Sequence, residues 1–270
     1  ASPIVDARLE DGSRVHVVLE PVALNGPILT IRKFPDPITM DRLLEYGSVT
    51  REAADLLKIL AAARYNIFVS GGTGAGKTTF LNALSEFIPP EERVITIEDS
   101  AELKLAHIEN LVRLETRNAN GEGQGAIGIG MLIRAALRMR PDRIVIGEVR
   151  GQEAVDLLQA MNTGHDGSFC TGHANSCRDM LARLETMVLM GMELPLPAIR
   201  SQIASALDVM VHVARMRNRS RKVTAIEEVV GIENGEIVLR PLFSLDGEGE
   251  LRKAGDLRCQ EKLRRAGYGL

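Results

Sequence analysis

The segment Gly71-Gly72-Thr73-Gly74-Ala75-Gly76-Lys77-Thr78 constrains the fold of this chain more than any other feature of its sequence. It fits the pattern G-x-x-x-x-G-K-[ST] in full, between an apolar strand pattern at 67–70 and a helical pattern to about residue 87. Its glycines let successive backbone N–H groups converge on phosphate oxygens, and a helix N-terminus adds positive potential. Lys77 is expected to reach the terminal phosphates and the Thr78 hydroxyl to ligate Mg²⁺. The segment therefore predicts a site for a nucleoside triphosphate such as ATP.

Strand and helix patterns alternate along most of the chain after residue 50. Thr50 is expected to cap a first helix at 51–64. Strands are then predicted at 67–70, 94–97, 111–114, 144–146, 167–171, 209–213, 223–232 and 237–239. Further helices are predicted from the glycine-rich turn to 87 and at 131–139, 152–161, 176–190 and 197–207. This alternation predicts an α/β fold with a mostly parallel sheet and helices on both of its faces.

The first 36 residues have a different pattern. Residues 4–9 and 14–19 alternate apolar and polar side chains around Asp11-Gly12, which predicts a hairpin, and a third strand is predicted at 28–34. We interpret residues 1–36 as part of a small N-terminal α+β domain. Pro35-Asp36-Pro37 then marks a linker at 37–49, before a main domain at 50–270 that ends in a strand-rich tail.

Composition excludes several classes of protein. The chain has 270 residues, of which 45% are apolar and 26% charged, so it has enough apolar surface to fold. Charged residues interrupt its apolar runs, and we expect no membrane-spanning helix. The net charge of -3 and 3% aromatic residues argue against nucleic acid as a partner. Three cysteines cannot form a disulfide framework, which favours a reducing compartment.

Two acidic residues follow predicted strands and are candidates to act beside the phosphates. Glu98 comes after the strand at 94–97, and Glu148 comes after the strand at 144–146. Gly147 occupies the position where a P-loop protein ordinarily has an aspartate that helps to hold the metal. Glu148 is therefore the candidate general base or water-orienting group, although a solvated carboxylate at a strand end remains the alternative for both glutamates.

These motifs resemble those of the secretion superfamily of hexameric ATPases, which power type II and type IV secretion and type IV pili. The likeness is greatest to the CpaF-like branch, which serves tight-adherence (Flp) pili. The segments that carry it are SGGTGAGKTT at 70–79, IEDSAEL at 97–103, VRLETR at 112–117, AALRMRPDRIVIGEVRG at 135–151, QAMNTGHDGS at 159–168, TGHANS at 171–176 and RLETMVLM at 183–190. The Gly147-Glu148 ending is itself a mark of this superfamily.

The resemblance implies a RecA-like ATPase core and a role for each matching residue. Glu98 would help to place Mg²⁺ and water, and Glu148 would be the Walker B glutamate. His173 would sense the γ-phosphate or link it to subunit movement. Arginines that approach the nucleotide, some from a neighbouring subunit, are matched by Arg113, Arg117, Arg138 and Arg140. Nucleotide-binding positions are matched by Gly71, Gly72, Thr73, Gly74, Ala75, Gly76, Lys77, Thr78, Thr79 and by the N-domain arginines Arg8 and Arg32.

The resemblance also implies a function: an ATP- and Mg²⁺-dependent hexamer that powers assembly or retraction of a type IV pilus of the Flp/Tad type, or of a related secretion machine. Such a motor would lie in the cytoplasm at the inner face of the cell membrane and work with inner-membrane platform proteins. Three alternatives remain: a conjugation or type II secretion ATPase, a RecA-like nucleic-acid motor, and a scaffold that binds ATP without hydrolysing it.

Two other patterns have competing interpretations. Cys170-x-x-His173-x-x-x-Cys177 offers three ligands where a structural zinc site needs four, so we interpret its cysteines as small buried thiols. A basic cluster at 215–222 is interpreted as a solvated hairpin turn, with a contact to an acidic partner or a lipid headgroup as the alternative.

Overall fold

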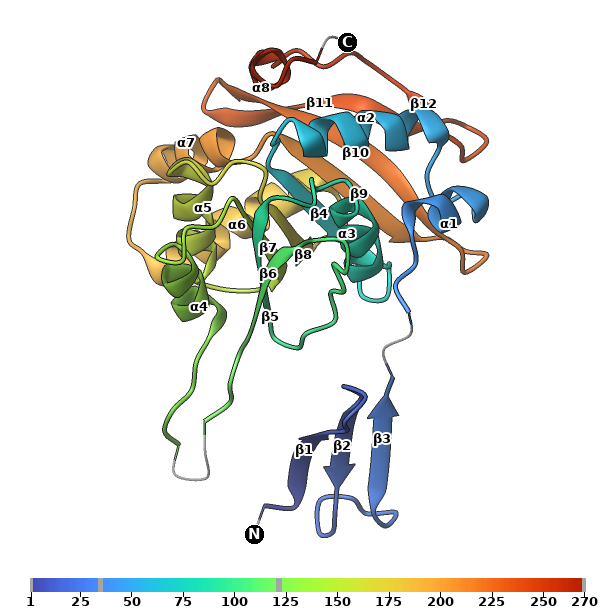
Figure 1. Ribbon diagram of the computed structural model, residues 1–270, viewed down its shortest axis with the longest axis vertical. Helices are drawn as coiled ribbons and strands as arrows, with labels where there is room; N and C mark the ends of the chain where they lie inside the picture. The colour runs from blue at the N-terminus through green and yellow to red at the C-terminus, as the bar shows by residue number, and fades with distance from the viewer. Residues whose placement is uncertain (1, 34–35, 120–122, 269–270) are drawn as a thin grey trace. The chain divides into compact units, whose positions relative to one another are not determined.

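The computed structural model in Figure 1 describes residues 2–33, 36–119 and 123–268. The chain divides into two compact units, Ala1–Pro37 and Ile38–Leu270. Phe34, the last residue of the third predicted strand, and Pro35, which precedes the expected linker, lie outside the described residues. Among the described residues, no helix is long and apolar enough to cross a membrane.

The first unit contains the three expected strands. β1 (Ile4–Arg8), β2 (Arg14–Val18) and β3 (Ile28–Arg32) form an antiparallel sheet in that order. The hairpin turn lies where Asp11-Gly12 predicts it, because Gly12 adopts a positive φ of 85° and Leu9 N–H donates to the Ser13 carbonyl oxygen at 2.9 Å. The described residues of this unit contain no helix.

The second unit is built on a nine-stranded sheet, counted over the described residues, with the order β12-β11-β10-β9-β4-β8-β7-β5-β6. The strands β9, β4, β8, β7, β5 and β6 are parallel, and β10, β11 and β12 extend the sheet in antiparallel fashion. The bounds are β4 (Ile67–Gly71), β5 (Arg93–Glu98), β6 (Asn110–Glu115), β7 (Arg143–Val149), β8 (Phe169–His173), β9 (Val209–Arg215), β10 (Arg221–Glu233), β11 (Glu236–Leu245) and β12 (Leu251–Lys253). The fold is thus the expected α/β type with a mostly parallel sheet.

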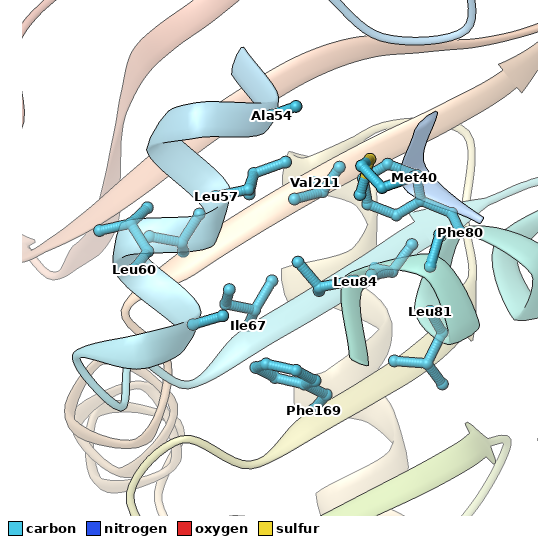
Figure 2. Packing of buried hydrophobic residues seen from close by; sticks show 14 of the residues in the cluster. Met40, Ala54, Leu57, Leu60, Ile67, Phe80, Leu81, Leu84, Phe169 and Val211 are labelled. Carbon is cyan, nitrogen blue, oxygen red and sulfur yellow. The ribbon is translucent and has the colours of Figure 1, made fainter. Parts of the chain in front are cut away.

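Helices cover both faces of this sheet (Figure 1). One face packs against α1 (Met40–Glu45), α2 (Arg51–Ala62), α3 (Lys77–Ser85) and α8 (Glu261–Arg265). The other packs against α4 (Ile129–Ala136), α5 (Ala154–Asn162), α6 (Cys177–Gly191) and α7 (Leu196–Ala206). Successive side chains of the central strands alternate between the two cores: Ile67 belongs to the first and Phe68 to the second. Figure 2 shows Ile67 among side chains of α2 and α3.

Several elements differ from the sequence-based expectations. The segment 37–49, expected as a linker, contains α1, and Met40 and Leu43 of α1 are buried in the first core. The helix has only six residues, too few for a periodic pattern to be visible. Thr50 does precede α2, but its hydroxyl is buried and makes no hydrogen bond among the described residues.

The C-terminal tail contains more structure than expected. β11 is longer than predicted because Pro241 lies within it, opposite Glu227, where the register with β10 shifts. Proline lacks a backbone donor, and an irregularity of this kind lets a strand accommodate it. β12 and α8 were not predicted at all, since three and five residues are too short for a readable pattern.

Candidate functional site

The glycine-rich turn joins β4 to α3 as its motif predicts. Gly76 precedes α3 with a positive φ of 95°, and Gly74 has a positive φ of 69°, conformations that residues with a side chain rarely adopt. The strand end is equally restricted, because a Cβ on Gly71 would collide with the carbonyl oxygen of Val213 in β9. The backbone of the turn therefore has the shape of a phosphate-binding loop.

Three residues from distant parts of the sequence meet at this loop. Lys77 Nζ lies 3.1 Å from His173 Nδ1, 3.2 Å from the Gly72 carbonyl oxygen and 3.9 Å from Glu148 Oε1. His173 Nε2 lies 2.9 Å from the same Glu148 oxygen. These distances fit one tautomer, in which Lys77 donates to Nδ1 and the Nε2–H group donates to the carboxylate.

Burial affects the charges of this group. The Lys77 side chain is 7% exposed, and burial lowers the pKa of its ammonium group, an effect that the Glu148 carboxylate opposes. Burial also lowers the pKa of His173, again against the attraction of Glu148. His173 is therefore neutral at pH 7, as the tautomer requires. The buried ammonium group of Lys77 can make a charge-assisted hydrogen bond to a phosphate oxygen at this loop.

Glu148 is also held by a residue that the sequence analysis missed. Arg150 Nε donates to Glu148 Oε2 at 2.6 Å, and Arg150 Nη1 donates to Asp99 Oδ2 at 2.9 Å. Arg150 directly follows the end of β7 and comes two residues after Glu148. This spacing was a usable signal, since residues i and i+2 of an extended segment lie on the same face. Arg150 thus links the carboxyl end of β7 to that of β5.

Glu98 lies in a different environment at the end of β5. Its Oε1 accepts hydrogen bonds from the backbone N–H groups of Glu102 at 2.9 Å and Leu103 at 3.0 Å, whereas Oε2 is buried without a partner among the described residues. Burial raises the pKa of Glu98 to about 7. A Cβ on Gly147 would come 3.0 Å from Glu98 Cγ, so the glycine at the unusual Walker B position leaves room for this side chain.

These residues fit a nucleotide with Mg²⁺. The glycine turn is a cradle that a Cβ at Gly71 would obstruct, and the buried, unpartnered oxygen of Glu98 is an unused ligand of the type that Mg²⁺ prefers. Thr78 follows Lys77 in the first turn of α3, in the position of a P-loop metal ligand. The hydrogen bonds described for Glu98 nevertheless join it to the 102–103 backbone rather than to the loop.

Two of the arginines expected at the nucleotide make their described hydrogen bonds to backbone carbonyl groups of nearby loops. Arg113 donates to the Ala101 carbonyl oxygen at 3.4 Å, and Arg117 donates to the Gly125 carbonyl oxygen at 2.8 Å. The side chains of all four core arginines are exposed: Arg113, Arg117, Arg138 and Arg140. In the first unit, the sheet pairs Arg14 of β2 with Arg8 of β1 on one side and with Arg32 of β3 on the other. Arg14 is thus a third arginine beside the two predicted N-domain arginines.

The cysteines of the Cys170–Cys177 segment are buried, as expected for small thiols. His173, between them in sequence, instead directs both ring nitrogens to Lys77 and Glu148. The described residues include no group of three or more His, Cys, Asp or Glu side chains that could hold a metal ion.

A mostly parallel sheet with a complete P-loop, and a glutamate and a histidine from neighbouring strands beside its lysine, defines a P-loop ATPase of the secretion type. The family model described as "Type II/IV secretion system protein" matches residues 1–241 of this chain. The chain belongs to this family. The narrower likeness to its CpaF-like branch remains a prediction.

Individual relatives agree with this assignment. A protein of Mycobacterium tuberculosis, provisionally named a conjugal transfer protein, is 45% identical over 234 residues, which is 84% of this chain and 66% of the relative. The type IV secretion system protein PtlH of Bordetella pertussis is 37% identical over 238 residues, 79% of this chain and 70% of PtlH. The chain thus spans about two thirds of these relatives.

A solved structure shows the same fold. The VirB11 ATPase from the Brucella suis type IV secretion system, crystallised with sulphate, superposes with a TM-score of 0.59 at 32% identity. The match covers 84% of this chain and 74% of that one.

Proposed function

We propose that this chain is the ATP-hydrolysing part of a hexameric motor that powers assembly or retraction of a type IV pilus of the Flp/Tad type, or a related secretion machine. The observation that carries the proposal is the meeting of Lys77, Glu148 and His173 at the P-loop, with Glu148 Oε1 2.9 Å from His173 Nε2 and 3.9 Å from Lys77 Nζ. The motif resemblance supports the choice of client.

Each residue of the site has a defined task in this proposal. The backbone N–H groups of the P-loop and Lys77 bind the phosphates, and the Thr78 hydroxyl and Glu98 would hold Mg²⁺, which neutralises charge that develops on the phosphate oxygens. Glu148 accepts a proton from, or orients, the attacking water. Neutral His173, fixed between Lys77 and Glu148, connects the phosphate end of the site to β8.

The exposed arginines favour a site that is completed between subunits. Phosphoryl transfer needs a cation to stabilise the transition state, and an arginine can be delivered in trans. The side chains of Arg113, Arg117, Arg138 and Arg140 are exposed, as residues that act on a neighbouring subunit must be. An isolated subunit would therefore hydrolyse ATP slowly and a hexamer quickly. The motor would act at the cytoplasmic face of the cell membrane through membrane partners.

The test is ATP turnover per subunit across a range of protein concentrations, with light scattering giving the mass of the same samples. We expect specific activity to rise as hexamers form and to be absent in a Lys77→Ala variant at every mass. Activity that stays constant between monomer and hexamer would reject the arrangement in trans. Tight ATP binding without turnover at any mass would identify a nucleotide-dependent scaffold instead.

A conjugation motor is the second candidate, because the Mycobacterium tuberculosis relative is named for conjugal transfer. The two clients differ in cells. A Lys77→Ala allele should abolish surface pili if the first proposal is right, and should abolish plasmid transfer with pili intact if the second is. Turnover stimulated by DNA would instead favour a nucleic-acid motor.

A further inference from the structure

β7 carries one extra residue, relative to its neighbour β8, at the point where it presents Glu148. The paired residues around this point are Val145 with Phe169, Ile146 with Cys170, and Val149 with Gly172. Between the last two pairs β7 advances from 146 to 149, whereas β8 advances only from 170 to 172. Gly147 and Glu148 therefore lie opposite Thr171 alone. Two residues against one is the count of a β-bulge, a feature that is common beside active sites because it re-aims a side chain.

The bulge changes the face of the sheet to which Glu148 belongs. Ile146 lies in the second core, and regular alternation along β7 would place the Glu148 side chain on that same face. Val149 lies in the second core instead. A shift of one residue exchanges the two faces of a strand. The extra residue therefore lets Glu148 leave the apolar face and meet Lys77 and His173.

Packing fixes the place where the bulge ends. Val149 is fully buried, and it pairs with Gly172 of β8. A Cβ on Gly172 would come 2.8 Å from Met180 Sδ and 3.0 Å from Phe68 Cε1, so the backbone of β8 lies close against the second core there. Because neither strand can slide at this pair, the extra residue is confined to the segment that contains Glu148.

One side chain of β8 binds the backbone of the bulge. Thr171 is 1% exposed, and its hydroxyl donates to the Gly147 carbonyl oxygen at 2.6 Å. That carbonyl group belongs to the peptide bond between Gly147 and Glu148. A buried hydrogen bond of this length orients the peptide unit, since leaving either buried group without a partner would be costly. Thr171 thus controls the backbone from which the Glu148 side chain starts.

We propose that Thr171 is a positioning residue for ATP hydrolysis: its hydroxyl holds the bulged backbone so that the Glu148 carboxylate is directed at the P-loop. The inference rests on the proposed function, since it requires Glu148 to act on the attacking water. Thr171 acts through Glu148 and not on the nucleotide. Such placement matters because a shift of about 1 Å in a reacting group can cost on the order of 100-fold in rate.

The experiment measures kcat, KM and equilibrium affinity for a non-hydrolysable ATP analogue, using the full chain at the concentration of maximal specific activity. Thr171→Val removes the hydroxyl and keeps the shape of the side chain, whereas Thr171→Ser keeps the hydroxyl. Thr96→Val is the matched control. Thr96 is buried in β5, on the other side of β7, and its hydroxyl has no partner among the described residues. Glu148→Gln is measured alone and combined with Thr171→Val.

We expect Thr171→Val to lower kcat by about 10- to 100-fold and to leave the affinity for the analogue within about twofold, because the P-loop is unchanged. Thr171→Ser should keep kcat within about threefold, and Thr96→Val should match the unmodified chain. In the Glu148→Gln background, Thr171→Val should lower the residual turnover by less than about twofold, because the group through which it acts has already been removed.

The outcomes separate this inference from the function on which it rests. Unchanged kcat in Thr171→Val, with turnover still lost in Glu148→Gln, would overturn the positioning role alone. An equal loss from Thr171→Val with and without Glu148→Gln would also overturn it, since Thr171 would not act through Glu148. Normal turnover in Glu148→Gln would overturn the proposed role of Glu148 itself. If circular dichroism shows that Thr171→Val does not fold, Thr171→Ala, which lacks the hydroxyl and leaves more room, takes its place with the same expected loss.

Discussion

Glu98 and Glu148 lie at the carboxyl ends of neighbouring parallel strands, β5 and β7, yet their surroundings are opposite. Glu148 lies among cationic or proton-donating groups: Arg150 at 2.6 Å, His173 at 2.9 Å and Lys77 at 3.9 Å. Glu98 is bonded only to backbone N–H groups in the described residues, and one of its oxygens has no partner there. The ends of neighbouring strands can therefore give their carboxyl groups very different surroundings.

The difference assigns different tasks to the two glutamates in the proposed mechanism. Glu148 is paired with basic groups and directed at the P-loop lysine, so it is suited to act on water beside the phosphates. Glu98 has a pKa raised to about 7 by burial, and a nearby divalent cation would draw it back to the ionised form. The predictions below test this contrast.

The largest expected effect is that of Glu148→Gln. Glutamine keeps the shape of the side chain but cannot take a proton, so kcat should fall by about 100-fold or more while ATP affinity changes little. Single-turnover hydrolysis and equilibrium binding on the same sample would measure both quantities. Turnover close to that of the unmodified chain would remove Glu148 from the chemistry.

The second prediction concerns Glu98→Gln, which should stabilise the fold at alkaline pH while lowering activity. Because the pKa of Glu98 is raised from 4.5 to about 7, the folded chain binds more protons than the unfolded chain in that interval. The contribution of Glu98 to the free energy of unfolding is fully present below pH 4.5, declines as pH rises, and is lost above about pH 7. This pKa shift corresponds to a difference of at most about 3 kcal/mol in the free energy of unfolding at pH 8.

Denaturant unfolding of both proteins at pH 5 and pH 8 measures this effect. Glu98→Gln should be the more stable at pH 8, and the advantage should shrink markedly at pH 5. Equal differences at the two pH values would show that Glu98 is ionised in the folded chain across this range. That outcome would show that burial does not keep the Glu98 carboxyl group protonated.

The sequence predicts the part of this site that local rules govern. The P-loop motif predicts its turn. Glu148 was a candidate because it follows a predicted strand, and His173 because of the family resemblance; both side chains lie beside Lys77. The burial of the Glu98 side chain could not be predicted, because the space for that side chain comes from Gly147, 49 positions further along the chain.

A cavity of about 360 Å³ lies beside the P-loop, lined by residues of α1, α3 and the β9–β10 hairpin, and it depends on contacts that are even more distant in sequence. It exists because β9 pairs with β4 and β10 pairs with β9, which brings Arg221 of β10 to Gly74 across 147 positions. It also needs α1, whose six residues give no periodic signal. Tertiary packing of this kind is not encoded in any local pattern.

A third prediction uses Gly147→Ala to alter the surroundings of Glu98 directly. The added Cβ would come 3.0 Å from Glu98 Cγ, and such overpacking costs about 1–3 kcal/mol. In a double-mutant cycle measured by urea unfolding, the combination with Glu98→Ala should be about 1 kcal/mol more stable than the sum of the two single changes predicts. Gly247→Ala is the control, since a Cβ there meets nothing within 4 Å. Strict additivity of the two changes would mean that Gly147 does not shape the Glu98 site.

The smallest expected effect belongs to Arg150→Gln, which alters the surroundings of Glu148. The Arg150 side chain is 63% exposed, so its pairing with Glu148 is screened by solvent, and His173 still holds the carboxylate when it is removed. We expect kcat to fall by about three- to tenfold with KM unchanged, and Arg150→Lys to recover part of the loss. The difference from the unmodified protein should narrow as salt is raised, because salt weakens the pair in that protein as well. A loss of kcat as large as that of Glu148→Gln would instead mean that Arg150 contacts the nucleotide itself. The contrast between the two glutamates would then depend on the bound nucleotide rather than on the protein groups around them.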